Sequence, residues 1–145
     1  MTARHQLGYW RDSKSLLAHS IAVAPGSPLL EWSLGHIYAR EGKYDDAEPL
    51  LRSSVPAIDT SEVHNEYGNV LWLKGRIPAA AAEYEQAIAR DPRNAEALYN
   101  SARALEAQGL RALARRRYIE FLRVAPPSLD GVKREVERTL QASAE

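Results

Sequence analysis

The strongest feature of this sequence is a pattern that recurs with a period of roughly 34 residues. Gly109 and Pro126 have counterparts one period earlier at Gly75 and Pro92, and Gly42 stands a further period upstream. Small and apolar residues between these positions recur in the same register. Self-similarity at such a period indicates short structural units that stack, because one unit alone cannot bury its apolar face.

Residues 95–126 show what one unit contains. Apolar residues recur three and four positions apart over 95–107 and again over 111–124, and Gly109 separates the two runs. This spacing is typical of amphipathic helices, and glycine favours the left-handed conformation that ends a helix. The sequence holds no alternating β-branched run of useful length. We therefore predict an all-α fold, an α-solenoid of stacked antiparallel helix hairpins.

The repeat predicts how a single domain is divided along the chain. Full units are expected at residues 27–60, 61–94 and 95–128, followed by a C-terminal capping helix over 129–145. Residues 1–26 align with the second half of a unit, with Gly8 at the position of the turn. We expect them to form a partial repeat, mainly its second helix, so that the chain either begins inside a longer array or carries a degenerate first hairpin.

Composition excludes several classes of function. Lysine plus arginine and aspartate plus glutamate both number 19, so no bulk charge indicates nucleic acid or an anionic membrane as partner. The absence of cysteine excludes disulfides, thiolate zinc sites and thiol nucleophiles. The sequence carries no secretory apolar segment and no run near the roughly 20 apolar residues of a membrane span. We expect a cytoplasmic protein without membrane insertion, and the abundance of alanine and arginine suggests a bacterial source.

Charge is nevertheless distributed unevenly along the chain. Residues 27–70 carry eight acidic residues against three basic ones, whereas residues 103–123 carry six arginines against two glutamates. The asymmetry could steer a partner or favour head-to-tail contacts, and ordinary solvated helix faces explain it equally well.

The recurring residues carry a family resemblance. They are Leu34, Gly35, Tyr38, Gly42, Tyr44, Ala47 and Leu51 in the first full unit, Gly68, Leu71, Gly75, Ala80, Tyr84, Ala87 and Pro92 in the second, and Leu98, Ala102, Leu105, Gly109, Ala114, Tyr118 and Pro126 in the third. This set is similar to the tetratricopeptide repeat (TPR) signature, W-x2-L-G-x2-Y followed by A-x3-F and then P within each repeat. The resemblance covers nearly the whole chain and implies a right-handed superhelix. His64 and Glu31 depart from it at the position of the large aromatic residue, and Phe121 replaces a small one.

The signature has a physical basis in packing. Small residues at Gly35, Gly68 and Ala102 are expected where the two helices of a hairpin touch. Large side chains such as Leu51, Tyr84 and Tyr118 are expected to fill the space between hairpins.

The resemblance implies a binding function on the concave face, which the first helix of each pair lines. Rigid aromatic, amide and guanidinium side chains dominate binding hot spots. We predict a non-catalytic scaffold that binds a peptide segment of a partner protein in this groove, through Trp32, His36, Asn65, Asn69, Trp72, Tyr99, Asn100 and Arg103. The alternative interpretation is that the asparagines are merely common in such repeats.

Some relatives grip a C-terminal carboxylate with two lysines, two asparagines and an arginine. Asn69, Asn100 and Arg134 match that arrangement, but Asn65 and Asp130 stand at the lysine positions. Without those cations the charge-assisted hydrogen bonds to a carboxylate are lost, which disfavours such a clamp.

Enzymatic and cofactor functions find no support in the sequence. The four histidines are scattered without metal-ligand spacing, and the sequence holds no glycine-rich phosphate loop and no nucleophile elbow. We predict no catalytic residue, no metal and no cofactor. Arg115, Arg116 and Arg117 point about 100° apart on a helix and so form no single nucleic-acid face.

The remaining alternative is structural. The chain could be an oligomerisation or accessory segment of a larger, possibly enzymatic or secretion-related, bacterial protein. A homo-oligomer could then form through the open N-terminal half repeat.

Overall fold

The chain folds into helices joined by short turns. The computed structural model describes the backbone of residues 3–142 and the side chains of residues 13–142. All regular structure within this range is helical, which confirms the predicted all-α fold. The chain divides into two compact units, residues 1–59 and residues 60–145, and each is described by itself.

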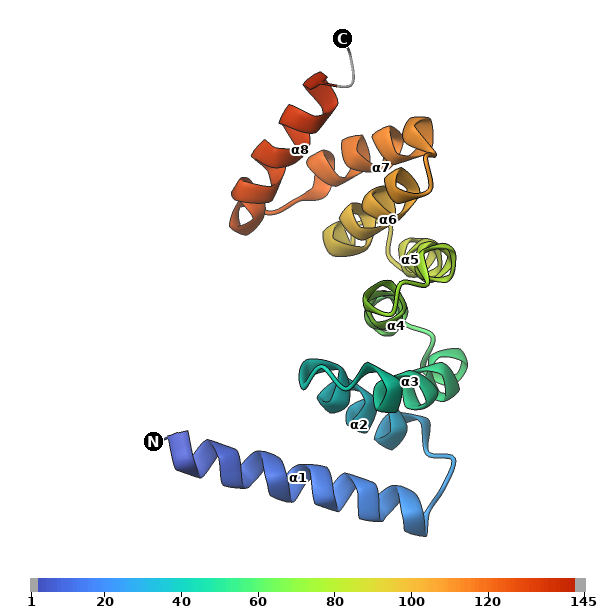
Figure 1. Cartoon of the computed structure of the whole chain (residues 1–145), viewed down its shortest axis with the longest axis vertical. Coiled ribbons are helices and arrows are strands. Elements are labelled where there is room, and N and C mark those ends of the chain that lie inside the picture. The colour runs from blue at the N-terminus through green and yellow to red at the C-terminus, as the bar shows by residue number, and fades with distance from the viewer. Residues whose placement is uncertain (1–2, 143–145) are drawn as a thin grey trace. The chain divides into compact units, whose positions relative to one another are not determined.

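The first unit holds α1 (Ala3–Val23), α2 (Pro28–Arg40) and α3 (Tyr44–Ile58). Pro28 occupies the first helical position of α2, where the amide proton it lacks has no intrahelical acceptor. Helices α2 and α3 form an antiparallel hairpin, and α1 packs against α2 (Figure 1). Lys14 of α1 binds Glu41 after α2 at 2.6 Å, and Lys43 binds the same carboxylate at 2.8 Å.

The predicted turn at Gly8 does not form. Helix α1 runs without a break from Ala3 to Val23 and passes through this position. A glycine inside a helix costs only about 1 kcal/mol relative to alanine, so it does not by itself end one. The assignment of residues 1–26 to a partial repeat stays a prediction.

The second unit contains two hairpins and a final helix. Its elements are α4 (Ser61–Leu73), α5 (Ile77–Arg90), α6 (Ala95–Ala107), α7 (Arg111–Val124), the 3-10 turn η1 (Pro127–Leu129) and α8 (Asp130–Ala142). Helix α4 pairs with α5 and α6 pairs with α7, and the two hairpins pack through α5 and α6 (Figure 1). Helix α8 packs on α7, and α6 also contacts α4. This is the stacked-hairpin solenoid that the sequence predicts.

The three hairpin turns share one backbone geometry. Gly42, Gly75 and Gly109 each have φ of +76°, a region that L side chains rarely adopt. In each turn the residue after the glycine donates its backbone N–H to a carbonyl five residues back, as Arg76 does to Leu71 at 2.9 Å. These bonds satisfy carbonyls at the end of the first helix and reverse the chain, which confirms the turns predicted there.

Small residues lie where paired helices meet, as predicted. A Cβ added to Gly68 would lie 2.6 Å from Tyr84 Cε1, and one added to Gly35 would lie 3.0 Å from Leu51 Cγ. Tyr84 and Leu51 therefore fill the space beside the glycine of their own hairpin, rather than only the space between hairpins. Both side chains are almost completely buried.

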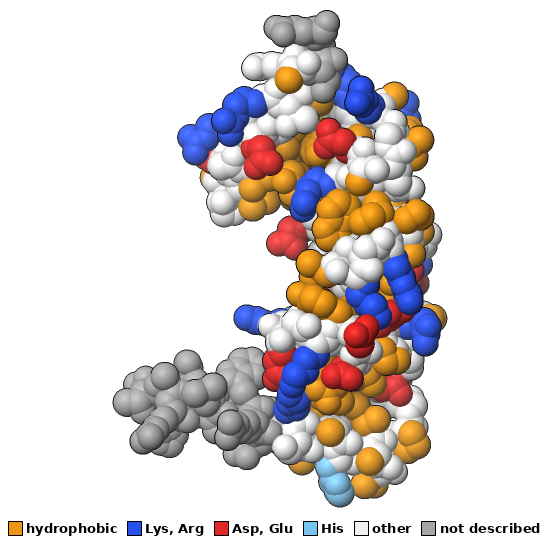
Figure 2. All heavy atoms as spheres, in the orientation of Figure 1, with side chains coloured by type: hydrophobic (Ala, Val, Ile, Leu, Met, Phe, Trp, Pro, Cys, Tyr) orange, Lys and Arg blue, Asp and Glu red, His pale blue; other side chains and the backbone are white. Residues whose placement is uncertain are grey.

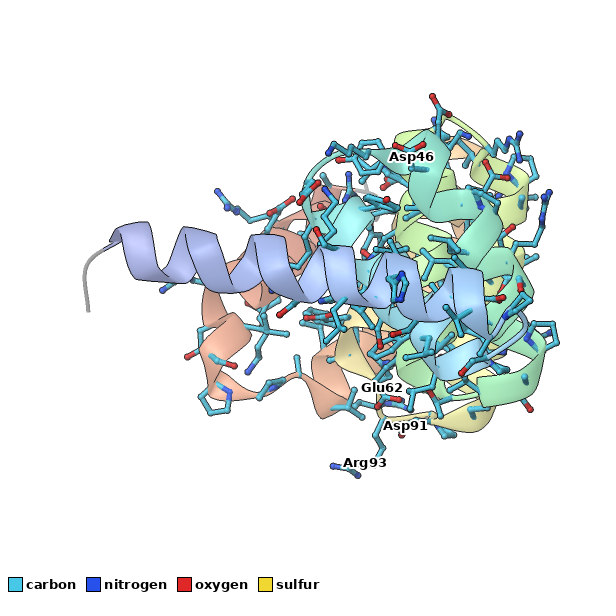
Figure 3. All side chains as sticks on the ribbon, turned by 90° about the horizontal axis from the view of Figure 1, so that it is seen from below. Asp46, Glu62, Asp91 and Arg93 are labelled. Atoms are coloured by element: carbon cyan, nitrogen blue, oxygen red, sulfur yellow. The ribbon has the colours of Figure 1, made fainter. Side chains whose placement is uncertain are left out.

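Polar side chains order the helix starts and loops of the second unit. Asn94 accepts a hydrogen bond from the Ala97 backbone N–H at 3.0 Å and so caps α6. Before it, the Asp91 carboxylate accepts from the Arg93 backbone N–H at 2.9 Å, and the Arg93 side chain extends away from the ribbon (Figure 3).

Among the described residues, no helix combines the length and apolar character needed to cross a membrane.

Candidate functional site

The eight predicted site residues lie on the first helices of the three hairpins. Trp32 and His36 lie on α2 in the first unit. The second unit carries the other six, with Asn65, Asn69 and Trp72 on α4 and Tyr99, Asn100 and Arg103 on α6. The outline of the second unit is hollowed between α8 and α4 (Figure 2). The role of these eight residues in binding stays a prediction.

Three asparagines form a hydrogen-bonded cluster that joins α4 to α6, and we call it the amide cluster (Asn65, Asn69 and Asn100). Asn100 Nδ2 donates to Asn65 Oδ1 at 3.1 Å and to Asn69 Oδ1 at 3.0 Å. Asn65 is buried, whereas the other two are half-buried. The side chains of two neighbouring hairpins therefore hold one another in a fixed arrangement.

Tyr84 of α5 hydrogen-bonds to the amide cluster. Its hydroxyl donates to Asn69 Oδ1 at 3.0 Å, and the ring is only 2% exposed. Burial raises the pKa of Tyr84, so the hydroxyl keeps its proton and remains a donor. Asn69 Oδ1 therefore accepts two hydrogen bonds, whereas Asn69 Nδ2 and Asn100 Oδ1 form none with the described residues and can serve as a donor and an acceptor.

Three further site residues form a stack, which we call the arginine stack (Trp72, Tyr99 and Arg103). The guanidinium carbon of Arg103 lies 4.8 Å from the centroid of the Trp72 ring and 5.7 Å from that of Tyr99. The two aromatic residues come from different hairpins, so the cation links them. Tyr99 rests on the buried Phe121 ring, with centroids 5.6 Å apart.

Trp32 and His36 form a separate pair in the first unit. Their ring centroids lie 5.6 Å apart at an interplanar angle of 32°. Trp32 Nε1 is buried and has no hydrogen-bond partner among the described side chains. The structure therefore gathers the six predicted residues of the second unit into two contiguous groups and leaves these two as a pair on α2.

The arginine run on α7 contains an unexpected structural contact. Arg117 binds both carboxylate oxygens of Glu85 on α5, with Nε 3.0 Å from Oε1, and binds Glu120 at 2.6 Å. Ser101 of α6 donates to Glu85 Oε1 at 2.6 Å. Glu85 is therefore a structural acid, because its carboxylate ties three helices of the second unit together. Arg117 is likewise half-buried rather than freely solvated.

This contact gives the stability of the protein a defined pH dependence. Burial would raise the pKa of Glu85, but hydrogen bonds from Arg117 and Ser101 outweigh it and hold the pKa below its ordinary value of 4.5. Well above pH 4.5 the Glu85 carboxyl is ionised in both the folded and the unfolded chain, so the contact stabilises the folded state fully. As the pH falls below it, the unfolded chain takes up the proton first and the stabilisation is lost.

We therefore expect Glu85→Gln to lower the unfolding free energy by a constant amount near neutral pH. The difference from wild type should shrink as the pH falls from 4.5. Denaturant titrations at a series of pH values measure it, and Glu137→Gln at an exposed position of α8 is the matched control. A difference that persists unchanged at low pH would contradict the assignment.

His64 is held by an acid of the same hairpin. Its side chain is buried, and its Nδ1 lies 2.7 Å from Glu83 Oε2. Glu83 is therefore another acid with a structural partner.

No group of three or more potential metal ligands occurs in the part of the chain that the structure describes.

Two residues that contribute to the site were not in the predicted set. Tyr84 was expected only to pack, yet its hydroxyl orients Asn69. Glu135 of α8 lies against Tyr99, where it adds to the rise that burial causes in the pKa of the Tyr99 hydroxyl. No sequence signal indicates either contact, because each depends on how one helix packs on another.

Stacked antiparallel hairpins with glycine turns, carrying amide and aromatic side chains on their first helices, define a helical-repeat protein. Family models agree with this class: one described as a TPR repeat matches residues 68–109, and one described as a tetratricopeptide repeat matches residues 33–62. Residues 33–62 and 68–109 therefore carry tetratricopeptide repeats.

Solved structures share the fold. A crystal structure of MamA aligns with a TM-score of 0.78 at 17% identity, over 97% of this chain and 92% of that one. A structure of MamA AMB-1 aligns with a TM-score of 0.73 at 26% identity, over 80% of this chain and 66% of that one. The type III secretion translocator chaperone SycD of Yersinia enterocolitica aligns with a TM-score of 0.71 at 19% identity, over 77% and 79%. No curated protein matches the sequence.

Proposed function

We propose that the chain is a non-catalytic protein-interaction scaffold that binds a peptide segment of a partner along the face formed by α4 and α6. The tetratricopeptide fold supports the scaffold role, and SycD, which is similar in fold, is named as a chaperone of another protein. The observation that carries the peptide-binding proposal is the amide cluster beside the arginine stack.

The amide cluster offers what a peptide backbone requires. Asn69 Nδ2 can donate to a backbone carbonyl, and Asn100 Oδ1 can accept from a backbone N–H. Because Tyr84 and the neighbouring asparagines fix the amide orientations, little conformational entropy is lost on binding. Trp72 and Tyr99 supply rigid aromatic area next to these polar groups, a combination enriched in binding hot spots.

The proposal predicts that Asn69→Ala combined with Arg103→Ala abolishes peptide capture. Each side chain can contribute about 1.4 kcal/mol of hydrogen bonding, so the affinity should fall by about 100-fold. The measurement is recovery of dodecapeptides from a random displayed library by the immobilised protein, followed by titration of a recovered peptide.

A matched control carries similar residue types elsewhere. Gln86 and Arg90 lie exposed on α5, where Arg90 Nη1 donates to Gln86 Oε1 at 2.6 Å. Gln86→Ala combined with Arg90→Ala should leave capture unchanged, and circular dichroism should show equal helicity in both double variants. Binding that survives the loss of Asn69 and Arg103 would rule out this face.

Exposed apolar side chains on the first unit favour the second candidate function, self-association or attachment to a larger assembly. Leu16 and Val23 of α1 are 66% and 71% exposed, and Leu29 of α2 is 62% exposed. Leu16 and Val23 are two helical turns apart and so lie on the same face of α1, and exposed apolar patches mark interaction surfaces. A mass in solution that rises with protein concentration, and that Leu16→Glu with Val23→Glu returns to a monomer, would support this function.

A further inference from the structure

Arg103 is a cation whose N–H groups form no hydrogen bond with any residue that the structure describes. It is exposed on α6, and among the described side chains its contacts are the rings of Trp72 and Tyr99. No carboxylate of the described residues forms an ion pair with it. This contrasts with Arg117 in the same unit, which binds two carboxylates. The charge of Arg103 is therefore available to a ligand.

The arginine stack leaves the N–H donors of the Arg103 guanidinium accessible to a ligand. A guanidinium packs on an aromatic ring through its flat face, whereas its N–H donors lie in its own plane. Contact with Trp72 therefore orients the group without consuming its donors. A rigid planar fork of N–H donors matches a carboxylate, which can accept two parallel hydrogen bonds.

Two residues of the arginine stack, Trp72 and Arg103, lie about one helical turn along from the amide cluster. Arg103 follows Asn100 by three residues on α6, and Trp72 follows Asn69 by three residues on α4. Residues three apart lie on the same side of a helix, about 5 Å apart. A segment whose backbone bonds to the amide cluster can therefore place one of its own side chains on Arg103.

Acidic residues beside the two groups limit how acidic that segment can be. Asn65 Nδ2 of the amide cluster lies 3.5 Å from Glu96 Oε2, and Glu135 lies against Tyr99 of the arginine stack. Like charges brought next to these carboxylates would repel. One carboxylate is accommodated at Arg103, whereas a run of several is disfavoured.

We propose that the partner segment carries a single aspartate or glutamate side chain that binds Arg103, flanked by uncharged residues; this inference rests on the proposed function. A side-chain carboxylate fits better than a chain terminus. No cation of the described residues hydrogen-bonds to the amide cluster, so a terminal carboxylate placed there would meet amides and Glu96.

The test is the sequence preference of the captured peptides. A random dodecapeptide library, displayed with every peptide C-terminus fused to its carrier, is selected on the wild-type protein and on Arg103→Gln. We expect wild type to enrich one acidic residue at a fixed position, and Arg103→Gln to recover peptides without that preference. Arg90→Gln, a matched exposed arginine on α5, should keep the wild-type preference.

A titration then isolates the contact. One enriched peptide is synthesised with its acidic residue and with the corresponding amide, each with an amidated C-terminus. Wild type should bind the acidic peptide about tenfold more tightly than the amide peptide, a difference expected for a charge-assisted bidentate pair, and Arg103→Gln should bind the two equally. Arg103→Lys should retain part of the difference, because it keeps the charge but loses the planar fork.

The outcomes separate the two proposals. Peptides that bind with no acidic preference, or that lose equal affinity in both forms on Arg103→Gln, would overturn this inference and leave peptide binding intact. Binding that requires a free C-terminal carboxylate would also overturn it. If folded wild type captures no peptide at all, the proposed function fails and this inference fails with it.

Discussion

Gly68→Leu is expected to destabilise the protein more than any surface change, by about 3 kcal/mol or more, which is the upper end of the cost of overpacking a core. The new Cβ alone would lie 2.6 Å from Tyr84 Cε1 and 2.8 Å from Cδ1. Tyr84 cannot move aside, because its ring is 2% exposed and its hydroxyl is bonded to Asn69. The α4–α5 hairpin must open, or the ring must leave its site.

Thermal and denaturant unfolding followed by circular dichroism measure this effect, and a fall in Tm of roughly 10 °C corresponds to that free energy. Gly131→Leu is the matched control, because it lies on α8 with no atom within 4 Å of an added Cβ. It should leave the Tm unchanged or slightly higher, since leucine favours a helix more than glycine does. An unchanged Tm for Gly68→Leu would refute the close approach of α4 and α5.

Relief of the clash provides a second check. With Tyr84→Leu already in place, the additional substitution Gly68→Ala should cost much less than it does in wild type. The two positions would then show a coupling energy of the kind that residues in direct contact display.

Phe121→Ala is the second large effect, because it should lower the unfolding free energy by about 3–5 kcal/mol, as expected for truncating a buried phenylalanine. Phe121 has no exposed surface and lies in the core formed by the α6–α7 hairpin and α8. It also supports Tyr99 from below at 5.6 Å, so the cavity should loosen the arginine stack as well.

The loss should be local rather than uniform. In stacked repeats each unit is stabilised mainly by its neighbours, so hydrogen exchange should rise first in α6, α7 and α8 and less in the first unit. Leu113→Ala on the same helix is the control, because Leu113 is 45% exposed and its truncation should have little effect. Equal loss of protection in α2 and α3 would contradict this picture of neighbour coupling.

Much of the fold could be predicted because its determinants are local. The helices over 95–107 and 111–124 follow from apolar spacing, and the turns at Gly42, Gly75 and Gly109 follow from a conformation that glycine adopts without strain. Because these local features recur at a fixed period, the same helices and turns could be predicted in each unit, and the recurring residues indicated the repeat family. Where the same reasoning was applied to Gly8, without a matching first helix, it was wrong.

The contacts of the candidate site depend on tertiary packing rather than on local sequence. The sequence pointed to Asn69, Asn100 and Arg103 as residues on first helices, but it could not show their bonds. Asn69 and Asn100 are 31 positions apart, and Glu85 and Arg117 are 32 apart. Whether such pairs meet depends on how one hairpin packs on the next.

The sequence by itself determined the helices, their turns and the repeat family, because helix periodicity and glycine conformation act within a few residues. Only the tertiary structure decided that Tyr84 orients Asn69, that Glu85 ties α5 to α6 and α7, and that Arg103 lies over the rings of Trp72 and Tyr99 without a carboxylate partner among the described residues. The physical reason is that side-chain hydrogen bonds and ring contacts form over a few ångströms, a distance that packing between hairpins sets and residue spacing does not.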